Sequence, residues 1–263
     1  MTKSNSQIIL NIEAVSKEFG GLSAVQDVSF YVKSTEIKAL VGPNGAGKTT
    51  LFNLITGTFP TTSGRIIYKG KEITGLPMHE IASLGISRTF QHPRLVTSMT
   101  VLENVMMGGY GRSKNSFFKH ALHFKNARIE EKEIKERALD LLSFVGIPHQ
   151  LQYVEQLSTG QEKLVELARA MISESSLILM DEPAAGLNDL ETEKLAEMIK
   201  WLKKDGKTIF IVEHNMDLVM GISDEVVVID HGQMITEGKP EIVKKDPRVI
   251  EAYLGSDATY SMV

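Results

Sequence analysis

The chain alternates short apolar runs with longer amphipathic segments. The clearest runs end at turn-forming or charged residues and are Ile37 to Val41, Leu177 to Met180, Thr208 to Val212 and Glu225 to Ile229. Runs of this kind are typical of strands that are buried on both faces of a parallel sheet. Because the segments between them have helical character, the pattern predicts an α/β fold with a mostly parallel sheet covered by helices.

A second strand pattern lies near the N-terminus, where ILNIEAVSKEF and VSFYV alternate apolar with polar residues. Two further segments, RIIYKGKEI and QMITEG, resemble parts of hairpins with glycine turns. Together they predict a smaller antiparallel β layer beside the parallel core.

The middle of the chain has a different pattern. Helix signals dominate from about Pro93 to Gln156, with apolar residues at helical spacing before a stop at Gly146 to Pro148. We expect residues 93–156 to form a helical subdomain inserted into the α/β core. The core then consists of residues 7–92 and 157–245, and a C-terminal helix and tail follow over 246–263.

Composition narrows the possible partners. The 263 residues carry 29 Lys and Arg against 33 Asp and Glu, a net charge of −4, which gives no global signal for a nucleic-acid partner. The sequence has no cysteine, which fits a reducing compartment. Neither a signal peptide nor an apolar run of about 18 residues, the length of a membrane span, is present. We therefore expect a soluble protein that reaches any membrane through a partner.

A glycine-rich segment directly follows the first buried run. GPNGAGKTT matches GxxxxGK[ST], a loop whose backbone N–H groups surround phosphates at the start of a helix. The lysine adds a charge, and Thr49 can bind Mg²⁺. A chance glycine-rich turn is the alternative, but the position between a strand and a helix disfavours it. The predicted nucleotide-binding residues of this loop are Gly42, Pro43, Asn44, Gly45, Ala46, Gly47, Lys48, Thr49 and Thr50.

Two adjacent carboxylates follow the run LILM. In a buried strand end such a pair is unfavourable unless a cation and a reacting water use it. We therefore expect Asp181 to hold the Mg²⁺ shell and Glu182 to orient and deprotonate the attacking water. An isolated Asp-Glu pair would more often be a solvated turn, but the phosphate loop reverses that preference. A GTPase would carry an NKxD element, which the sequence lacks.

Further motifs resemble those of the ABC ATPase family. LSTGQ resembles the LSGGQ signature and precedes LILMDEP by one short helix, while AAGLN occupies the position of the D-loop. Gln91 in RTFQ resembles the Q-loop glutamine, His214 in VEHN resembles the switch histidine, and Phe19 stands where the family has an aromatic that stacks on adenine. Taken alone, each of these elements has an ordinary interpretation. The histidine could be a surface residue, the phenylalanine could belong to the core, and LSTGQ could be a helix N-cap.

The resemblance implies a P-loop NTPase fold of the RecA-like type that hydrolyses ATP with Mg²⁺. It adds Ser158, Gly160 and Gln161 to the nucleotide site, from a second subunit, because one chain's loop and signature face apart in the family. It also implies that Gln91 and His214 assist catalysis and that Gln91 reaches the metal.

Within the family, RTFQHPRLV, VEHNMDLVMGISD and RVIEAYLG are most similar to ATPase subunits of branched-chain amino-acid importers. Importers of urea or short-chain amides have similar subunits, and an ABC ATPase that moves no solute is a further alternative. Two positions depart from the general family pattern: Thr159 replaces a signature glycine, and Asn188 replaces the usual D-loop aspartate.

This resemblance implies a set of partners and a location. We expect transmembrane permease subunits, a second ATPase subunit in a heterodimer or homodimer, and indirectly a solute-binding protein, with no nucleic acid. The chain would then lie peripherally on the cytoplasmic face of the cell membrane.

Overall fold

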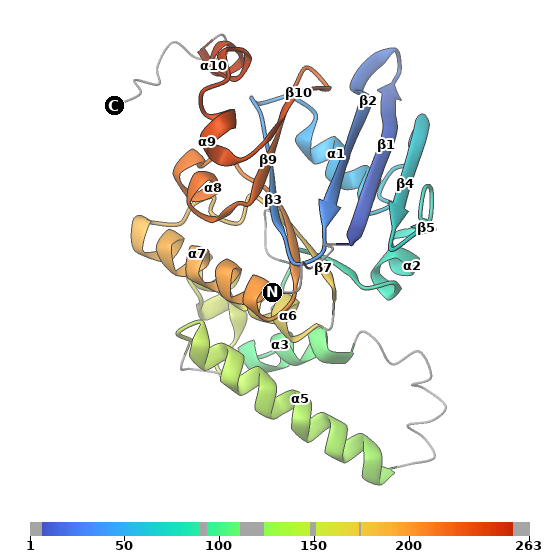
Figure 1. Cartoon of the computed structure of the whole chain (residues 1–263). Helices are drawn as coiled ribbons and strands as arrows, with labels where there is room; N and C mark the ends of the chain where they lie inside the picture. Colours follow the sequence, from blue (N-terminus) through green and yellow to red (C-terminus); the bar gives the residue numbers. More distant parts are fainter. Residues whose placement is uncertain (1–6, 90–93, 111–123, 148–150, 174, 255–263) are drawn as a thin grey trace, which may run out of the picture.

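In a computed structural model of the chain, residues 7–89, 94–110, 124–147, 151–173 and 175–254 are described. Two sheets form the molecule, with helices packed around the larger one (Figure 1). The larger sheet has the strand order β10-β9-β3-β8-β7-β6 and the smaller one the order β2-β1-β4-β5. The predicted α/β class, with a parallel core and an antiparallel layer, is confirmed.

All neighbours in the larger sheet are parallel except β10, which runs antiparallel to β9. Its strands are β3 (Ile37–Val41), β6 (Ile86–Thr89), β7 (Leu177–Asp181), β8 (Thr208–Val212), β9 (Glu225–Asp230) and β10 (Gln233–Gly238). The four apolar runs became β3, β7, β8 and β9. Strand β6 escaped the sequence analysis because its sequence, ISRT, contains no apolar run.

The smaller sheet is antiparallel throughout. It consists of β1 (Ile8–Phe19), β2 (Leu22–Lys33), β4 (Ser63–Tyr68) and β5 (Lys71–Glu72). The expectation that residues 233–238 belong to this layer was wrong. His231 and Gly232 have φ values of 45° and 79°, a left-handed pair that closes a tight hairpin. This turn places β10 beside β9, at the edge of the larger sheet.

Alternation along the buried strands gives the larger sheet two apolar faces. On β7, Ile178 and Met180 join one core cluster, and Leu177 and Leu179 join the other. The first cluster includes residues of α3, α5, α6, α7 and α8, and the second includes α1 and the small sheet. The helices are α1 (Lys48–Ile55), α2 (Met78–Ser83), α3 (Val101–Gly109), α5 (Phe124–Phe144), α6 (Thr159–Ile172), α7 (Asp189–Lys204), α8 (Met216–Ile222), α9 (Pro240–Val243) and α10 (Pro247–Leu254), with a short 3₁₀ helix, η2 (Val154–Gln156).

Helices α3, α5 and α6 pack against one another, on the side of the molecule away from the antiparallel sheet (Figure 1). The approach of α3 to α6 is close at Gly108, where an added Cβ would lie 2.2 Å from the carbonyl oxygen of Arg169. Among the described helices, none is both long and apolar enough to cross a membrane.

Candidate functional site

The candidate site lies at the carboxyl ends of three adjacent parallel strands. In the register of the sheet, Leu40 of β3 pairs with Val212 of β8, and Val212 pairs with Asp181 of β7. The chain leaves β3 into the phosphate loop, β8 towards His214 and β7 into Glu182. Ligands of open α/β sheets bind outside this edge, so the topology gathers the sequence-predicted groups where a nucleotide would be expected.

The phosphate loop is wedged between other segments of backbone. A Cβ on Gly42 would lie 2.1 Å from the carbonyl oxygen of Ile229, and one on Gly47 would lie 2.4 Å from that of Ala24. Gly47 also has a left-handed φ of 100°. Both positions therefore require glycine, and they hold the loop in place as α1 begins at Lys48.

The ammonium group of Lys48 lies inside this loop. It donates hydrogen bonds to the carbonyl oxygens of Gly42 at 2.6 Å and Pro43 at 2.8 Å. Burial lowers the pKa of Lys48, while the charges of Glu182 and Asp181 act in the opposite direction. The lysine therefore lies within electrostatic range of both predicted catalytic carboxylates. Thr49, in the first turn of α1, is exposed, as are Asn44 and Gly45, whereas Ala46 is buried and Thr50 is half-buried.

The two carboxylates at the end of β7 have different surroundings. Asp181 is buried, and its Oδ2 lies 2.6 Å from a guanidinium nitrogen of Arg88. The side chain of Glu182 is 20% exposed, and its Oε2 lies 3.9 Å from Nδ1 of His214. The φ of Glu182 is 46°, a strained value for this residue type, and its N–H donates to the Val212 carbonyl at 2.9 Å.

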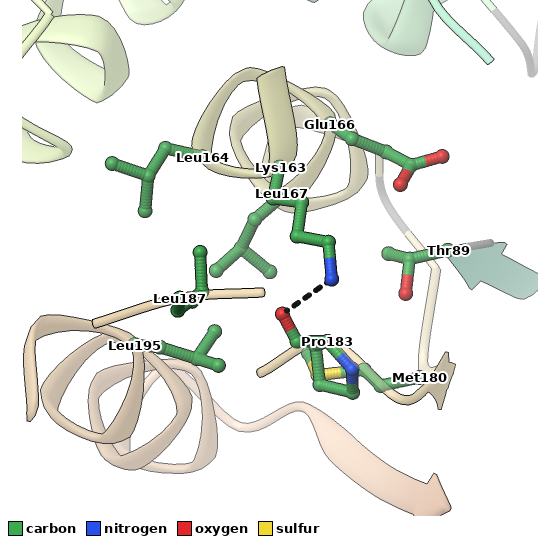
Figure 2. A pocket seen from close by; sticks show the side chains of 9 residues that line it. All are labelled: Thr89, Lys163, Leu164, Glu166, Leu167, Met180, Pro183, Leu187 and Leu195. Atoms are coloured by element: carbon green, nitrogen blue, oxygen red, sulfur yellow. Dashed lines mark hydrogen bonds between the residues drawn. The ribbon is translucent and has the colours of Figure 1, made fainter. Parts of the chain in front are cut away.

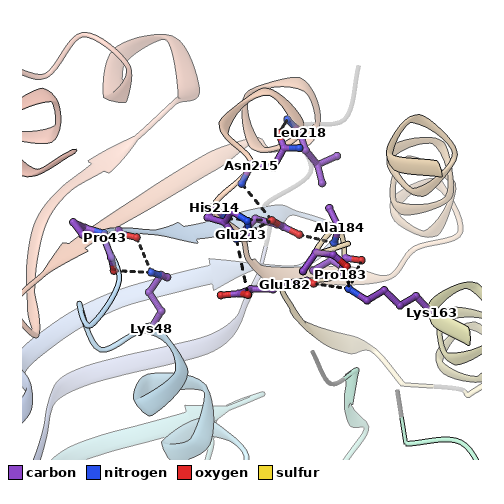
Figure 3. Close-up of polar contacts among 12 residues, drawn as sticks. Pro43, Lys48, Lys163, Glu182, Pro183, Ala184, Glu213, His214, Asn215 and Leu218 are labelled. Carbon is purple, nitrogen blue, oxygen red and sulfur yellow. Dashed lines mark hydrogen bonds and ion pairs between the residues drawn. The ribbon is translucent and has the colours of Figure 1, made fainter. Parts of the chain in front are cut away.

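Two buried residues of opposite charge, Lys163 and Glu213, contact the turn that follows Glu182 (Figure 3). Lys163 of α6 donates to the carbonyl oxygens of Glu182 at 3.3 Å and Pro183 at 3.4 Å, and also to that of Ala185. Burial lowers the pKa of Lys163, and nearby carboxylates, Glu213 first, oppose this shift. The residue that carries the predicted base is thus tied by Lys163 to the helix that begins with the signature.

A small pocket lies behind this turn (Figure 2). Its walls are mainly apolar, with the Lys163 ammonium pointing towards Pro183 in the middle of the view. The lining residues are Thr89, Lys163, Leu164, Glu166, Leu167, Met180, Pro183, Leu187 and Leu195. Since no residue of the phosphate loop lines it, this pocket is separate from the predicted nucleotide site.

The signature residues form the start of α6. Ser158 is the N-cap: its hydroxyl accepts from the Gln161 N–H at 3.3 Å, and Gln161 Oε1 accepts from the Ser158 N–H at 3.0 Å. A Cβ on Gly160 would lie 2.5 Å from a carboxylate oxygen of Glu191. The capping interpretation of LSTGQ is confirmed, whereas its nucleotide role stays a prediction. In the described part of the chain, no hydrogen bond links these residues to the phosphate loop.

The D-loop departure has a structural explanation. Asn188 is the N-cap of α7, accepting from the Glu191 N–H at 2.9 Å, while the Glu191 carboxylate accepts from the Asn188 N–H at 3.0 Å. Asparagine and aspartate are both strong N-caps, so the substitution preserves the helix start.

The predicted adenine platform lies on the surface of the antiparallel sheet. Phe19 is 41% exposed and makes an edge-to-face contact with Phe59, with ring centroids 5.6 Å apart. The ammonium of Lys17 lies 4.9 Å from the Phe19 ring centroid. Gln91, predicted for catalysis and for the metal, lies outside the described residues.

Three charged residues that contact the site were not predicted from the sequence: Arg88, Lys163 and Glu213. All are buried or nearly so, and each contacts the segment 181–185 through a hydrogen bond or ion pair. One signal was available for Glu213, because a charged residue that directly continues a buried apolar strand needs a partner.

Comparisons with known proteins agree with this geometry. A family model described as ABC transporter matches residues 25–185, and one described as Branched-chain amino acid ATP-binding cassette transporter matches residues 233–259. The chain is 40% identical over 252 residues to the high-affinity branched-chain amino acid transport ATP-binding protein LivG of Escherichia coli (strain K12), covering 95% of this chain and 99% of that protein. It is 41% identical over 249 residues to a probable LivG of Archaeoglobus fulgidus, with coverage of 94% and 96%.

Solved structures that are similar to this chain include ATP-binding cassettes. A crystal structure of an ATP-binding cassette of an ABC transporter in its ADP conformation has a TM-score of 0.81 at 36% identity and covers 95% of this chain and 100% of that chain. A dimeric ATP-binding cassette in a post-hydrolysis state, bound to ADP and Pi, has a TM-score of 0.76 at 25% identity, covering 88% of this chain and 99% of that one. A family match over more than half of the chain, and 40% identity over nearly its whole length, lead to one assignment: the chain belongs to the ABC transporter family of ATP-binding cassettes.

Proposed function

We propose that the chain is the ATP-hydrolysing subunit of an importer for branched-chain amino acids. The observation that carries the ATPase assignment is the convergence of Lys48, Asp181, Glu182 and His214 at the carboxyl ends of adjacent strands. The solute class rests on the names of the relatives and on the C-terminal family match.

The nucleotide site in this proposal is shared between two subunits. Phe19 and residues Gly42 to Thr50 of one subunit bind ATP, and Ser158, Gly160 and Gln161 of the other close over the phosphates. The dimeric relative bound to ADP and Pi supports such an arrangement. Backbone N–H groups and a helix N-terminus supply most of the phosphate contacts.

Thr49, Asp181 and Gln91 would hold Mg²⁺. Hard oxygen ligands suit this ion, which usually takes one or two protein ligands and completes its shell with phosphates and water. The ion supplies charge neutralisation and orientation of the phosphates.

Glu182 is the general base that takes a proton from the attacking water. Nδ1 of His214 lies 3.9 Å from the Glu182 carboxylate, and in this proposal His214 contacts the terminal phosphate and keeps that carboxylate oriented. Lys48 donates to loop carbonyls and would exchange these bonds for phosphate oxygens. The chemistry is phosphoryl transfer by positioning and charge stabilisation, with Gln91 completing the site.

In this proposal residues 93–156 form the helical subdomain and contact transmembrane permease subunits. A solute-binding protein delivers the solute to those permease subunits. The packing of α6 against α3 and α5 supports a path from the signature to those helices. The chain would work at the cytoplasmic face of the membrane, paired with a second ATPase subunit.

Solute uptake by the organism that encodes the chain tests which class of solute the importer carries. Cells whose chromosomal copy carries Glu182→Gln should lose uptake of labelled leucine, isoleucine and valine to the level of a deletion, while the exposed variant Glu241→Gln behaves as the parent. Loss of urea or acetamide uptake instead would assign the chain to that class of importer. Unchanged uptake of every solute would favour an ABC ATPase outside transport.

A further inference from the structure

The guanidinium group of Arg88 connects two elements that are distant in sequence. One terminal nitrogen lies 2.6 Å from Oδ2 of Asp181, at the end of β7. The other donates to Asn53 Oδ1 at 2.7 Å and to Thr56 Oγ1 at 3.2 Å, at the far end of α1. The ion pair is nearly inaccessible, with side-chain exposures of 9% for Arg88 and 8% for Asp181.

The contacts to α1 lie on the same helix face as Thr49. Residues 49, 53 and 56 are spaced at i, i+4 and i+7, which places them in one row along a helix. Arg88 therefore binds the face of α1 that carries Thr49 through one nitrogen, and its second nitrogen pairs with Asp181.

We propose that Arg88 is a positioning residue which sets the spacing between Thr49 and Asp181 that Mg²⁺ requires. The inference rests on the proposed function, because those two residues are metal ligands only in an ATPase site. Mg²⁺ demands near-ideal octahedral geometry, so its ligands need to be held within about 0.5 Å of their positions. A carboxylate has two oxygens, and the contact with Arg88 engages Oδ2, so that Oδ1 can face the metal.

The planar fork of arginine is what makes both contacts together. Lysine has the same charge, but its three donors share one nitrogen at the end of the chain, so it does not reproduce the two separated nitrogens that reach Asp181 and α1. Glutamine has neither the charge nor the reach. Arg88→Lys and Arg88→Gln therefore remove the connection in two steps, whereas Arg65→Gln, which breaks a surface pair with Glu13, is the matched control.

The test compares ATP affinity with Mg²⁺ and with EDTA, using a fluorescent ATP analogue and the full chain. In Arg88→Gln we expect the Mg²⁺ concentration for half-maximal hydrolysis to rise about tenfold, the lower end of the effect of residues that orient metal ligands. Saturating Mg²⁺ should restore most of kcat. The gain in ATP affinity on adding Mg²⁺ should shrink towards that of Asp181→Asn, and affinity in EDTA should stay within about twofold of the parent. Arg88→Lys should lie between the two, and Arg65→Gln should match the parent.

The double variant Arg88→Gln with Asp181→Asn should behave as Asp181→Asn alone, because the spacing that Arg88 sets matters only while the Asp181 carboxylate binds the metal. The proposal is overturned if Arg88→Gln keeps the parent's Mg²⁺ dependence, or if the two substitutions are additive. Should Arg88→Gln fail to bind ATP in EDTA, Arg88→Lys decides by the same measurement. A parent chain that binds no ATP, or hydrolyses none with Mg²⁺, would refute the proposed function instead.

Discussion

The carboxylate of Glu213 accepts a 2.7 Å hydrogen bond from the backbone N–H of Ala184. Its other oxygen accepts from the N–H groups of His214 at 3.1 Å and Asn215 at 3.3 Å. One fully buried carboxylate thus fixes the turn after Glu182 and the start of the segment that carries His214. The relative positions of the base and the histidine depend on this residue as well as on the sheet.

Glu213→Gln should slow hydrolysis without weakening nucleotide binding. The amide can accept through one oxygen only, so at least one of the three N–H groups loses its acceptor, at a cost of about 1–3 kcal/mol in the free energy of unfolding where that group is buried, as at Ala184. We expect kcat to fall about tenfold, since a small misplacement of a catalytic group has large effects on rate. Urea unfolding measures the free energy of unfolding and phosphate release measures kcat, with the exposed variant Glu241→Gln as control. An unchanged kcat in a destabilised variant would show that Glu213 acts on stability alone.

Glu182→Gln should bind ATP and fail to hydrolyse it. The amide keeps the shape of the side chain and removes the base, so the rate should fall by the ~10²–10⁴ typical of lost general-base catalysis. Equilibrium binding and single-turnover hydrolysis are measured in parallel. Hydrolysis at the parent rate would assign the base to another residue.

Ser158→Arg should abolish ATP-dependent dimerisation in the Glu182→Gln background, because the arginine fills the space over the partner's phosphates. Light scattering with Mg-free ATP reports the mass, and bound nucleotide is measured alongside. Since Ser158 is also an N-cap, its loss costs about 1 kcal/mol of stability by itself. Thr100→Arg is the matched control, because Thr100 caps α3 with the same capping box. A monomeric Thr100→Arg variant, or lost nucleotide binding in Ser158→Arg, would contradict a signature that acts on the partner's site. If the natural partner is a different ATPase, the measurement is made with that partner present.

The base of the nucleotide should be selected weakly. Stacking on Phe19 uses the ring face that every base has, so ATP and GTP should bind within about a hundredfold of each other, or ~2.7 kcal/mol. Phe19→Leu should weaken both by a similar factor, about tenfold. Dissociation constants for the two nucleotides decide this. A stronger preference for ATP would mean that hydrogen bonds to the adenine edge select the base.

Alkaline pH should reveal the packing of α10. Tyr253 packs against the core cluster that includes α7 and α8. Burial raises the pKa of its hydroxyl from 10.0 to about 12, and a hydrogen bond with the Gly42 backbone opposes this shift. The unfolded chain loses this proton first, so the contribution to stability is present below about pH 10 and is lost as pH rises through about 12. Between about pH 9 and pH 11 the free energy of unfolding of the parent should fall by about 1 kcal/mol more than that of Tyr253→Phe, as measured by urea unfolding. Equal losses would show that the hydroxyl titrates normally in the folded chain.

The sequence by itself determined the elements and the motifs that are local in the chain. Apolar runs specify β3, β7, β8 and β9 because burial on both faces of a sheet needs several consecutive apolar residues. The glycines of the phosphate loop are readable as a motif between a strand and a helix, although Gly42 and Gly47 are required by the close approach of the remote Ile229 and Ala24 carbonyls.

Only the tertiary structure decided which charged groups meet. Arg88 and Asp181 are 93 residues apart, and Glu213 and Ala184 are 29 apart. Their contacts depend on the strand order β3-β8-β7-β6, which differs from the order along the chain. A charged residue in a buried segment predicts that it has a partner. No periodicity in the sequence identifies that partner, because strands that are distant in sequence become neighbours in the sheet. The same reason applies to the hydrogen bonds between Lys163 and the turn after Glu182.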